Sequence, residues 1–119
     1  GGYLIIEQTE ALSVIDVNSG KNVTKAKSME AIEASALKTN LEAADKLCQQ
    51  IKVRNLSGII IVDFINMNQT NSDILMEHLK SLAKKDIVST TIVDITKLGL
   101  VEITRKKVGK SLSESLNKA

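Results

Sequence analysis

The alternation of apolar and polar residues at the start of the chain predicts a short hairpin. Tyr3 to Ile6 is rich in branched apolar side chains, a polar turn follows, and Ala11 to Val17 is apolar again. Such runs favour strands, and the short connection favours an antiparallel pair. In the second run, alternation separates one face with Leu12, Val14 and Asp16 from another with Ser13, Ile15 and Val17. One acidic residue therefore shares a strand face with apolar side chains.

The next segment has the apolar spacing of a helix. Its seam consists of residues alternately four and three apart, namely Leu37, Leu41, Ala44, Cys48 and Ile51. Ser28 is suited to cap the first turn of this helix. Thr39 and Glu42 also have the spacing of a capping box, so the segment from Ser28 to Arg54 fits one long helix or two. The place of Cys48 on the seam favours a buried structural thiol over a reactive one.

The second half of the chain predicts three strands and one more helix. The expected elements are a strand at 59–64, a helix from Asn71 or Ser72 to Lys85, and strands at 90–95 and 100–104. The run at 59–64 does not alternate, which favours a central strand covered on both faces. His78 is expected to be an ordinary helix residue, because no second His or Cys stands at metal-binding spacing from it. This order of elements predicts an α/β or α+β fold with a mixed sheet.

Composition supports one domain with an aliphatic core. The chain has 119 residues, 43% of them hydrophobic and 25% charged, and Tyr3 and Phe64 are its only aromatic residues. So few rings disfavour the RNA-binding folds that stack several bases on aromatic side chains. The single cysteine excludes a disulfide within the chain and a Cys-type zinc site. No apolar run approaches the ~20 residues of a membrane span, and no leader precedes the first strand, so we expect a soluble, cytoplasmic domain.

Lysine and arginine are unevenly distributed, although the formal net charge is only +2. One cluster consists of Lys21, Lys25 and Lys27, and the other of Arg105, Lys106, Lys107 and Lys110. On charge alone, a solvated surface is the favoured interpretation of both clusters. From residue 109 onward the chain is polar, and we expect a frayed tail at 109–119.

Two carboxylates occupy strand positions that hydrophobic patterning would otherwise fill. They are Asp16 in the second strand and Asp63 near the end of the central strand, and Asn18 continues the face of Asp16. An ionised carboxylate at such a position needs a hydrogen bond, a cation or a metal. Two aspartates with waters and phosphate oxygens are a common Mg²⁺ site, but strand-end caps or surface pairs explain the same pattern. No Cys–His pair, glycine-rich phosphate loop or Gly-x-Ser-x-Gly elbow offers another chemistry.

Several blocks of the sequence resemble, in order, the catalytic region of the ribonuclease E/G family. They are residues 2–12, 15–20, 39–44, 58–67 and 97–105. The resemblance implies that residues 1–108 form the DNase I-like subdomain, cut out of a longer chain, of an endoribonuclease that cleaves single-stranded RNA. It further implies that Asp16 and Asp63 match the two aspartates that hold one catalytic Mg²⁺, and that Asn18 matches the asparagine that assists them. Family members often carry an acidic residue where Asn66 stands.

The leading hypothesis is therefore a Mg²⁺-dependent endoribonuclease domain that acts in RNA processing. We expect its RNA contacts at Lys21, Arg105, Lys106 and Lys107, and a homo-oligomer for the full-length protein. The chain lacks the S1 domain, the pocket for the RNA 5′ end and the Cys-x-x-Cys zinc link of the family, so a non-enzymatic RNA-contacting fragment is the second hypothesis. A phosphoacceptor signalling domain is the third, disfavoured because the first strand does not end in an acidic pair.

Overall fold

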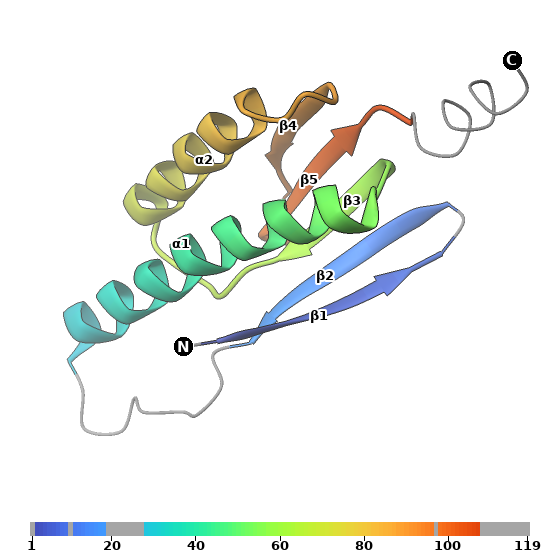
Figure 1. Cartoon of the computed structure of the whole chain (residues 1–119). Helices are drawn as coiled ribbons and strands as arrows, with labels where there is room; N and C mark the ends of the chain where they lie inside the picture. Colours follow the sequence, from blue (N-terminus) through green and yellow to red (C-terminus); the bar gives the residue numbers. More distant parts are fainter. Residues whose placement is uncertain (1, 10, 19–27, 97, 108–119) are drawn as a thin grey trace, which may run out of the picture.

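The chain forms a mixed five-stranded sheet with two helices, as expected for the α/β class. The computed structural model describes residues 2–9, 11–18, 28–96 and 98–107 (Figure 1). Its elements are β1 (Tyr3–Gln8), β2 (Leu12–Asn18), α1 (Met29–Arg54), β3 (Gly58–Asp63), α2 (Gln69–Lys84), β4 (Thr90–Ile95) and β5 (Leu100–Arg105). The expected tail at 109–119 lies outside the described residues. Within them, no helix combines the length and hydropathy that a bilayer crossing requires.

The order of strands brings the carboxyl ends of β2 and β3 to the same edge of the sheet. The order is β1-β2-β3-β5-β4, so β3 is central, as predicted. The β1–β2, β3–β5 and β4–β5 pairs are antiparallel, whereas β2 and β3 are parallel. Parallel neighbours need a long crossover connection, and α1 provides it. Residues at the carboxyl ends of β2 and β3 are therefore neighbours in space.

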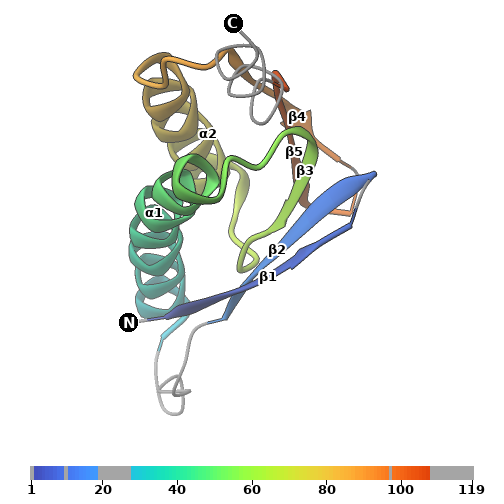
Figure 2. The same ribbon diagram turned by 45° about the vertical axis from the view of Figure 1, so that its right-hand side comes forward.

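Both helices pack on one face of this sheet, as both views show (Figures 1 and 2). The core between the layers includes Leu47 and Ile51 from α1, Leu79 from α2, and Ile60 and Val62 from β3. The described residues place no second layer on the opposite face, where Ile59 is 43% exposed. The expectation that the central strand is covered on both faces is wrong for the described residues. A continuous apolar run shows that both faces of a strand carry apolar side chains, but it does not show whether another layer packs on each face.

The segment after Ser28 is one helix rather than two. The Ser28 side chain accepts a hydrogen bond from the Ala31 N–H at the start of α1, and Asn55 ends it in a left-handed conformation with φ 52°. The helix continues through Thr39 and Asn40, because Asn40 points inward instead of capping a new helix. Such a left-handed residue after the last turn is a common way to end a helix.

The second helix starts earlier than Asn71 or Ser72, the predicted starts. The side chain of Asn68 accepts a hydrogen bond of 2.8 Å from the backbone N–H of Asn71, so Asn68 caps α2. Asparagine is a strong capping residue, and the sequence offers two of them three positions apart. The structure uses the first, which places Asn71 within the first turn.

Candidate active site

Asp16 and Asp63 lie side by side in the sheet. They are register partners in the parallel β2–β3 pair; Asp63 is the last residue of β3, and Asp16 stands two residues before the carboxyl end of β2. Neighbouring strands are about 4.8 Å apart, and side chains at paired positions share a face. The buried positions Ile15 and Val62 next to them point toward the helices, so both carboxylates point to the uncovered face. The sheet thus brings together the two aspartates that the sequence analysis singled out.

No cation within the described residues neutralises this pair of carboxylates. The ion pairs there join His78 to Asp45 and Arg105 to Asp86, not Asp16 or Asp63 to a base. Asp63 is exposed and Asp16 is half-buried, and their row across the sheet is completed by the apolar residues Ile5 and Leu100. Two like charges at this separation repel one another. The arrangement therefore fits a divalent cation held between them.

Asn18 adds a free hydrogen-bond donor to the same face. It stands two residues after Asp16 on β2, and its side-chain Nδ2 is buried without a hydrogen-bond partner among the described residues. A buried donor without a partner is destabilising unless a ligand or water accepts from it. A phosphate oxygen or a metal-bound water would satisfy it. This observation fits a substrate or metal site at the aspartate pair.

The described residues hold no cluster of three or more His, Cys, Asp or Glu side chains that could enclose a metal ion. A cation at Asp16 and Asp63 would therefore take only two carboxylates from this part of the chain. Mg²⁺ is commonly bound in this way, because it keeps several waters and accepts substrate phosphate oxygens as its other ligands. The residues present thus fit a hydrated Mg²⁺ better than an all-protein cage.

The chain that leaves Asp63 is fastened to α1 by Asn40, a residue that the sequence analysis did not assign to the site. Asn40 is 0% exposed. Its Nδ2 donates to the Ile65 carbonyl at 2.8 Å, and its Oδ1 accepts from the Ile65 N–H at 3.0 Å. One buried residue, Phe64, separates this anchor from Asp63. Strand pairing on one side and Asn40 on the other therefore fix the backbone around Asp63. The only signal in the sequence was a polar residue within an apolar helix seam.

Glu33 fastens the same connection at a second point, two helical turns before Asn40 on α1. Its Oε1 accepts hydrogen bonds from the backbone N–H of Asn68 at 3.0 Å and from Nδ2 of Asn71 at 2.9 Å. The connection from β3 to α2 is thus bound to α1 near both of its ends. Asn66 lies between these points and is exposed.

We expect the substitution Asn40→Leu to lower the free energy of unfolding of the 119-residue chain by about 2–4 kcal/mol. The change leaves the N–H and C=O of Ile65 without partners, and each unsatisfied buried group costs ~1–3 kcal/mol. Urea unfolding followed by circular dichroism measures the effect. The matched control Gln49→Leu removes an exposed amide from the same helix, and we expect it to stay within ~0.5 kcal/mol. Equal stability of the two variants would contradict the anchoring role.

Arg105 does not lie on the surface with its lysine neighbours. Its side chain is 3% exposed, and its Nε donates to Oδ2 of Asp86, itself 5% exposed, at 2.8 Å. Its Nη1 donates to Oδ1 of Asn55 at 2.9 Å and to the carbonyl of Leu56 at 3.0 Å. That Arg105 contacts RNA stays a prediction, although the structure binds its guanidinium to protein acceptors. Arg105 joins the end of α1 to the connection before β4.

The buried ion pair of Arg105 and Asp86 makes the free energy of unfolding depend on pH. Burial acts to raise the pKa of Asp86, but hydrogen bonds from Arg105, Val88 and Thr90 lower it below the ordinary value of 3.8. A lowered pKa in the folded chain stabilises it above pH 3.8, and this contribution is lost as the pH falls through the lowered value. We therefore expect the difference in urea midpoint between the wild type and Asp86→Asn to be constant near neutral pH. This difference should shrink as the pH falls from about 3.8 through the lowered pKa of Asp86. A difference that grows on acidification would contradict this assignment.

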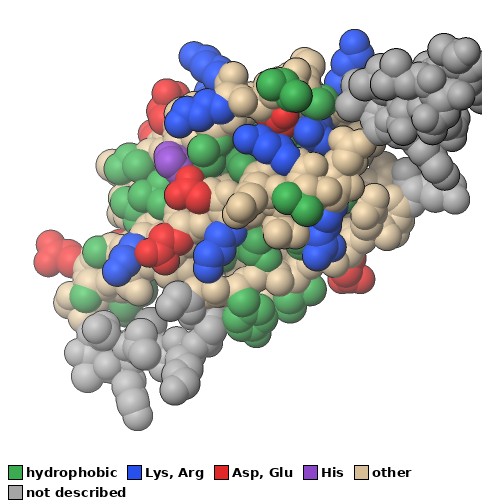
Figure 3. Space-filling view, in the orientation of Figure 1, with side chains coloured by type: hydrophobic (Ala, Val, Ile, Leu, Met, Phe, Trp, Pro, Cys, Tyr) green, Lys and Arg blue, Asp and Glu red, His purple; other side chains and the backbone are tan. Residues whose placement is uncertain are grey.

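Lys106 and Lys107 are exposed, but they lie at the far end of the sheet from the aspartates. In the β3–β5 register, Leu100 pairs with Asp63, whereas Arg105 pairs with Gly58. Five strand residues correspond to about 17 Å. Lys21, predicted to act with these lysines, lies outside the described residues. On the face seen in Figure 3, the described Lys and Arg side chains are scattered among acidic and apolar ones and form no continuous basic patch.

His78 and Cys48 stand apart from the candidate site. His78 Nε2 lies 2.8 Å from Oδ1 of Asp45 and links α2 to α1, as expected for an ordinary helix residue. Burial raises the pKa of the Cys48 thiol to about 11. A thiol with so high a pKa is scarcely ionised near neutral pH, which agrees with a structural role.

The fold and site define an α/β domain with two paired aspartates on one face of its mixed sheet. The family model of the ribonuclease E/G family matches residues 1–108. The chain is 47% identical to Ribonuclease E of Synechocystis over 115 residues and 40% identical to Ribonuclease G of Escherichia coli strain K12 over 117 residues. It is 44% identical to the Ribonuclease E/G-like protein of Porphyra purpurea. The chain belongs to the ribonuclease E/G family.

These alignments use nearly all of the chain but a small part of each relative. They cover 96% of the chain and 16% of the Synechocystis protein, 98% and 23% for the Escherichia coli protein, and 96% and 22% for the Porphyra protein. The chain thus corresponds to one segment of these ribonucleases.

Proposed function

We propose that this chain is the catalytic region of a Mg²⁺-dependent endoribonuclease that hydrolyses phosphodiester bonds in single-stranded RNA during RNA processing. The observation that carries the proposal is the register pairing of Asp16 and Asp63 at the carboxyl ends of two parallel strands. Membership of the ribonuclease E/G family supports the reaction class. The proposal extends to a cytoplasmic location and to a homo-oligomeric full-length enzyme.

Each residue of the proposed site has a defined task. Asp16 and Asp63 would hold the cation through their carboxylates, and Asn18 would donate its free N–H to a phosphate oxygen or a bound water. Bound Mg²⁺ supplies an activated water and neutralises charge on the phosphate. Asn40 keeps the backbone that follows Asp63 in place. The lone histidine, His78, lies on the helix layer and is not needed as a base.

Cleavage of a single-stranded oligonucleotide with and without Mg²⁺ tests the proposal. We expect cleavage by a ribonuclease E/G protein that contains this chain only when Mg²⁺ is present. Cleavage that survives removal of divalent cations by EDTA would contradict the proposed chemistry.

An RNA-contacting segment without activity of its own is the second candidate. It is favoured because the chain spans only 16–23% of the relatives' length, so cleavage can require other segments of such proteins. The same oligonucleotide experiment on the 119-residue chain separates the two candidates. Binding of RNA without Mg²⁺-dependent cleavage supports the second.

We expect Lys106 and Lys107 to contribute to RNA binding through phosphate charge. Each neutralised phosphate on a single strand adds ~0.7 to the slope of log affinity against log salt, so Lys106→Ala/Lys107→Ala should reduce the slope by ~1.4. Binding of a short RNA across a salt series measures it. The pair Lys84→Ala/Lys85→Ala removes two adjacent exposed lysines at the end of α2 and serves as the matched control. Equal slopes for the wild type and the Lys106/Lys107 variant would rule out this contact.

A further inference from the structure

We propose that Tyr3 is a stacking platform for one nucleobase of the RNA substrate, next to the cleaved bond. This inference rests on the proposed function, because it assigns a substrate contact to the same face as the aspartate pair. Tyr3 is 55% exposed, and the other aromatic residue of the chain, Phe64, is 7% exposed and part of the core. Tyr3 is therefore the only one of the Phe, Tyr and Trp side chains of this sequence that is exposed to a base, and the partly exposed His78 ring lies on α2, in the helix layer.

The register of β1 places Tyr3 beside the proposed site. Tyr3 pairs with Asn18, and Ile5 pairs with Asp16, so Tyr3 and Asp16 are diagonal neighbours on adjacent antiparallel strands. Diagonal neighbours are ~7–8 Å apart, within reach of an aromatic side chain. A phosphate held at Asp16 and Asp63 would therefore bring the base of an adjoining nucleotide to the Tyr3 ring.

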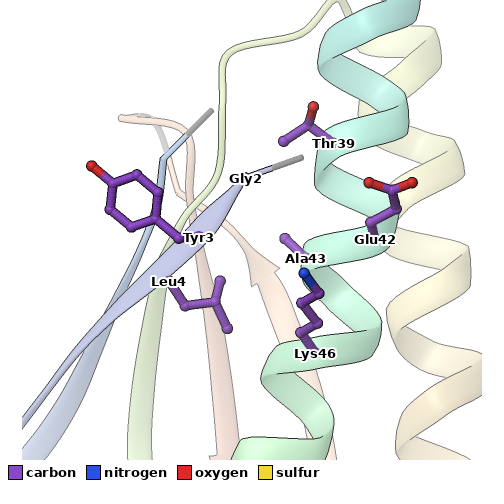
Figure 4. Close-up of a pocket in the computed structure, with 7 residues that line it drawn as sticks. All are labelled: Gly2, Tyr3, Leu4, Thr39, Glu42, Ala43 and Lys46. Atoms are coloured by element: carbon purple, nitrogen blue, oxygen red, sulfur yellow. The ribbon is translucent and has the colours of Figure 1, made fainter. Parts of the chain in front are cut away.

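The Tyr3 ring lies on the uncovered face, at the end of β1 that follows Gly2. Figure 4 shows the Tyr3 ring directed away from α1, the helix that carries Thr39, Ala43 and Lys46. Gly2 packs so closely against β2 that an added Cβ would clash with the carbonyl oxygen of Asn18. The strand that carries Tyr3 is thus tied to the residue that carries the free Nδ2 donor.

Stacking fits this position better than hydrogen-bond recognition does. Ile5, the next residue of β1 on the same face, is apolar and offers no donor or acceptor to a base edge, and the free Nδ2 of Asn18 is already assigned to a phosphate oxygen or a bound water. Every base has a π-face, so an exposed ring binds bases with little sequence preference. We therefore expect one base to be held by its face at Tyr3, with little discrimination between the four nucleotides.

The test combines substitutions at Tyr3 with removal of a base from the substrate. It uses a ribonuclease E/G protein that contains this chain and an RNA cleaved at one known bond. Matched RNAs lack the base on either side of that bond. Stacking on an aromatic ring corresponds to ~5-fold to 100-fold in affinity. We expect Tyr3→Ala to lower kcat/KM by a factor in this range and Tyr3→Phe to stay within about 2-fold of the wild type.

The coupling between the protein and RNA changes decides the proposal. Removing the base that stacks on Tyr3 should impair the wild type and Tyr3→Phe, but not impair Tyr3→Ala or Tyr3→Leu further. Tyr3→Leu keeps an apolar side chain on β1, so it separates loss of stacking from loss of strand stability. Ile59→Ala truncates another exposed apolar residue on the same face, about 13 Å along β3 from Asp63, and should leave kcat/KM unchanged.

Two results would overturn the inference. One is an unchanged kcat/KM for Tyr3→Ala, and the other is an equal effect of base removal on the wild type and on Tyr3→Ala. The second result, together with a lower thermal midpoint or a loss of oligomer for Tyr3→Ala, would show that protein covers Tyr3. The proposed function fails separately if the wild type does not cleave, or if cleavage does not depend on Asp63.

Discussion

Asp63→Asn is expected to lower Mg²⁺-dependent RNA cleavage by ~10³-fold or more, while the fold stays intact. The variant keeps the volume of the side chain but removes one of two anionic ligands from the proposed cation. Charge stabilisation by a bound metal contributes several kcal/mol, and ~4 kcal/mol corresponds to a factor of ~10³. Asp63 is exposed at the end of β3, so its neutral isostere should not disturb the core. Single-turnover cleavage at saturating RNA measures the effect.

The controls for this prediction separate the site from general charge effects. Asp73→Asn makes the same chemical change on α2, in the helix layer, and should leave the rate unchanged. The double variant Asp16→Asn/Asp63→Asn should be little worse than either single variant, because groups that act as one unit are not additive. Cleavage by Asp63→Asn at the wild-type rate would remove the catalytic assignment.

Arg105→Met is expected to destabilise the 119-residue chain by ~3–5 kcal/mol, the usual cost of removing one partner from a buried ion pair. The change leaves Asp86 buried without its cation and removes the hydrogen bonds to Asn55 and Leu56. Urea unfolding at pH 7 measures the loss. Lys106→Ala, at the next position, changes an exposed cation and should stay within ~0.5 kcal/mol.

A second variant shows whether the loss comes from the unpaired charge. Arg105→Met/Asp86→Leu removes both charges, and replacing a buried pair by apolar residues is often nearly neutral. We therefore expect the double variant to recover part of the stability lost by Arg105→Met, although Asn55 and Leu56 remain without their donor. A double variant less stable than the single variant would contradict this explanation.

Sequence patterns predicted the elements because periodicity and caps are local. The alternation in β2, the seam of α1 and the runs that became β4 and β5 each report one face of one element. The cap at Ser28 was predicted, whereas the start of α2, at Gln69, was placed two or three residues late at Asn71 or Ser72. Two asparagines compete there, and the tertiary contacts of Glu33 with Asn68 and Asn71 accompany the earlier start.

The juxtaposition of Asp16 and Asp63 was an expectation that depended on strand order. Each aspartate stood out because it interrupts an apolar strand, which is a property of the sequence itself. That the two aspartates lie side by side follows only once β2 and β3 are known to be adjacent and parallel. The catalytic role of the pair remains a proposal, supported by family membership and by the free donor on Asn18.

The partners of Arg105 and Asn40 could not be identified from local pattern. Arg105 stands in a basic run, Arg105-Lys106-Lys107, and charge composition cannot distinguish a buried guanidinium from its exposed neighbours. Strand alternation alone puts Arg105 on the core side, with Val101 and Ile103. Asn40 lies beside the capping-box spacing of Thr39 and Glu42, and nothing local indicated its partner, the backbone of Ile65, which is 25 residues away.

A crystal structure with Mn²⁺ in place of Mg²⁺ and a short non-cleavable RNA tests the central claim most directly. Anomalous scattering locates Mn²⁺ without assumptions about its ligands. The account predicts one peak within about 2.5 Å of a carboxylate oxygen of both Asp16 and Asp63, with a phosphate oxygen completing the coordination. A peak bound to other residues, or no peak at saturating Mn²⁺, would contradict the claim that these two aspartates hold the catalytic cation.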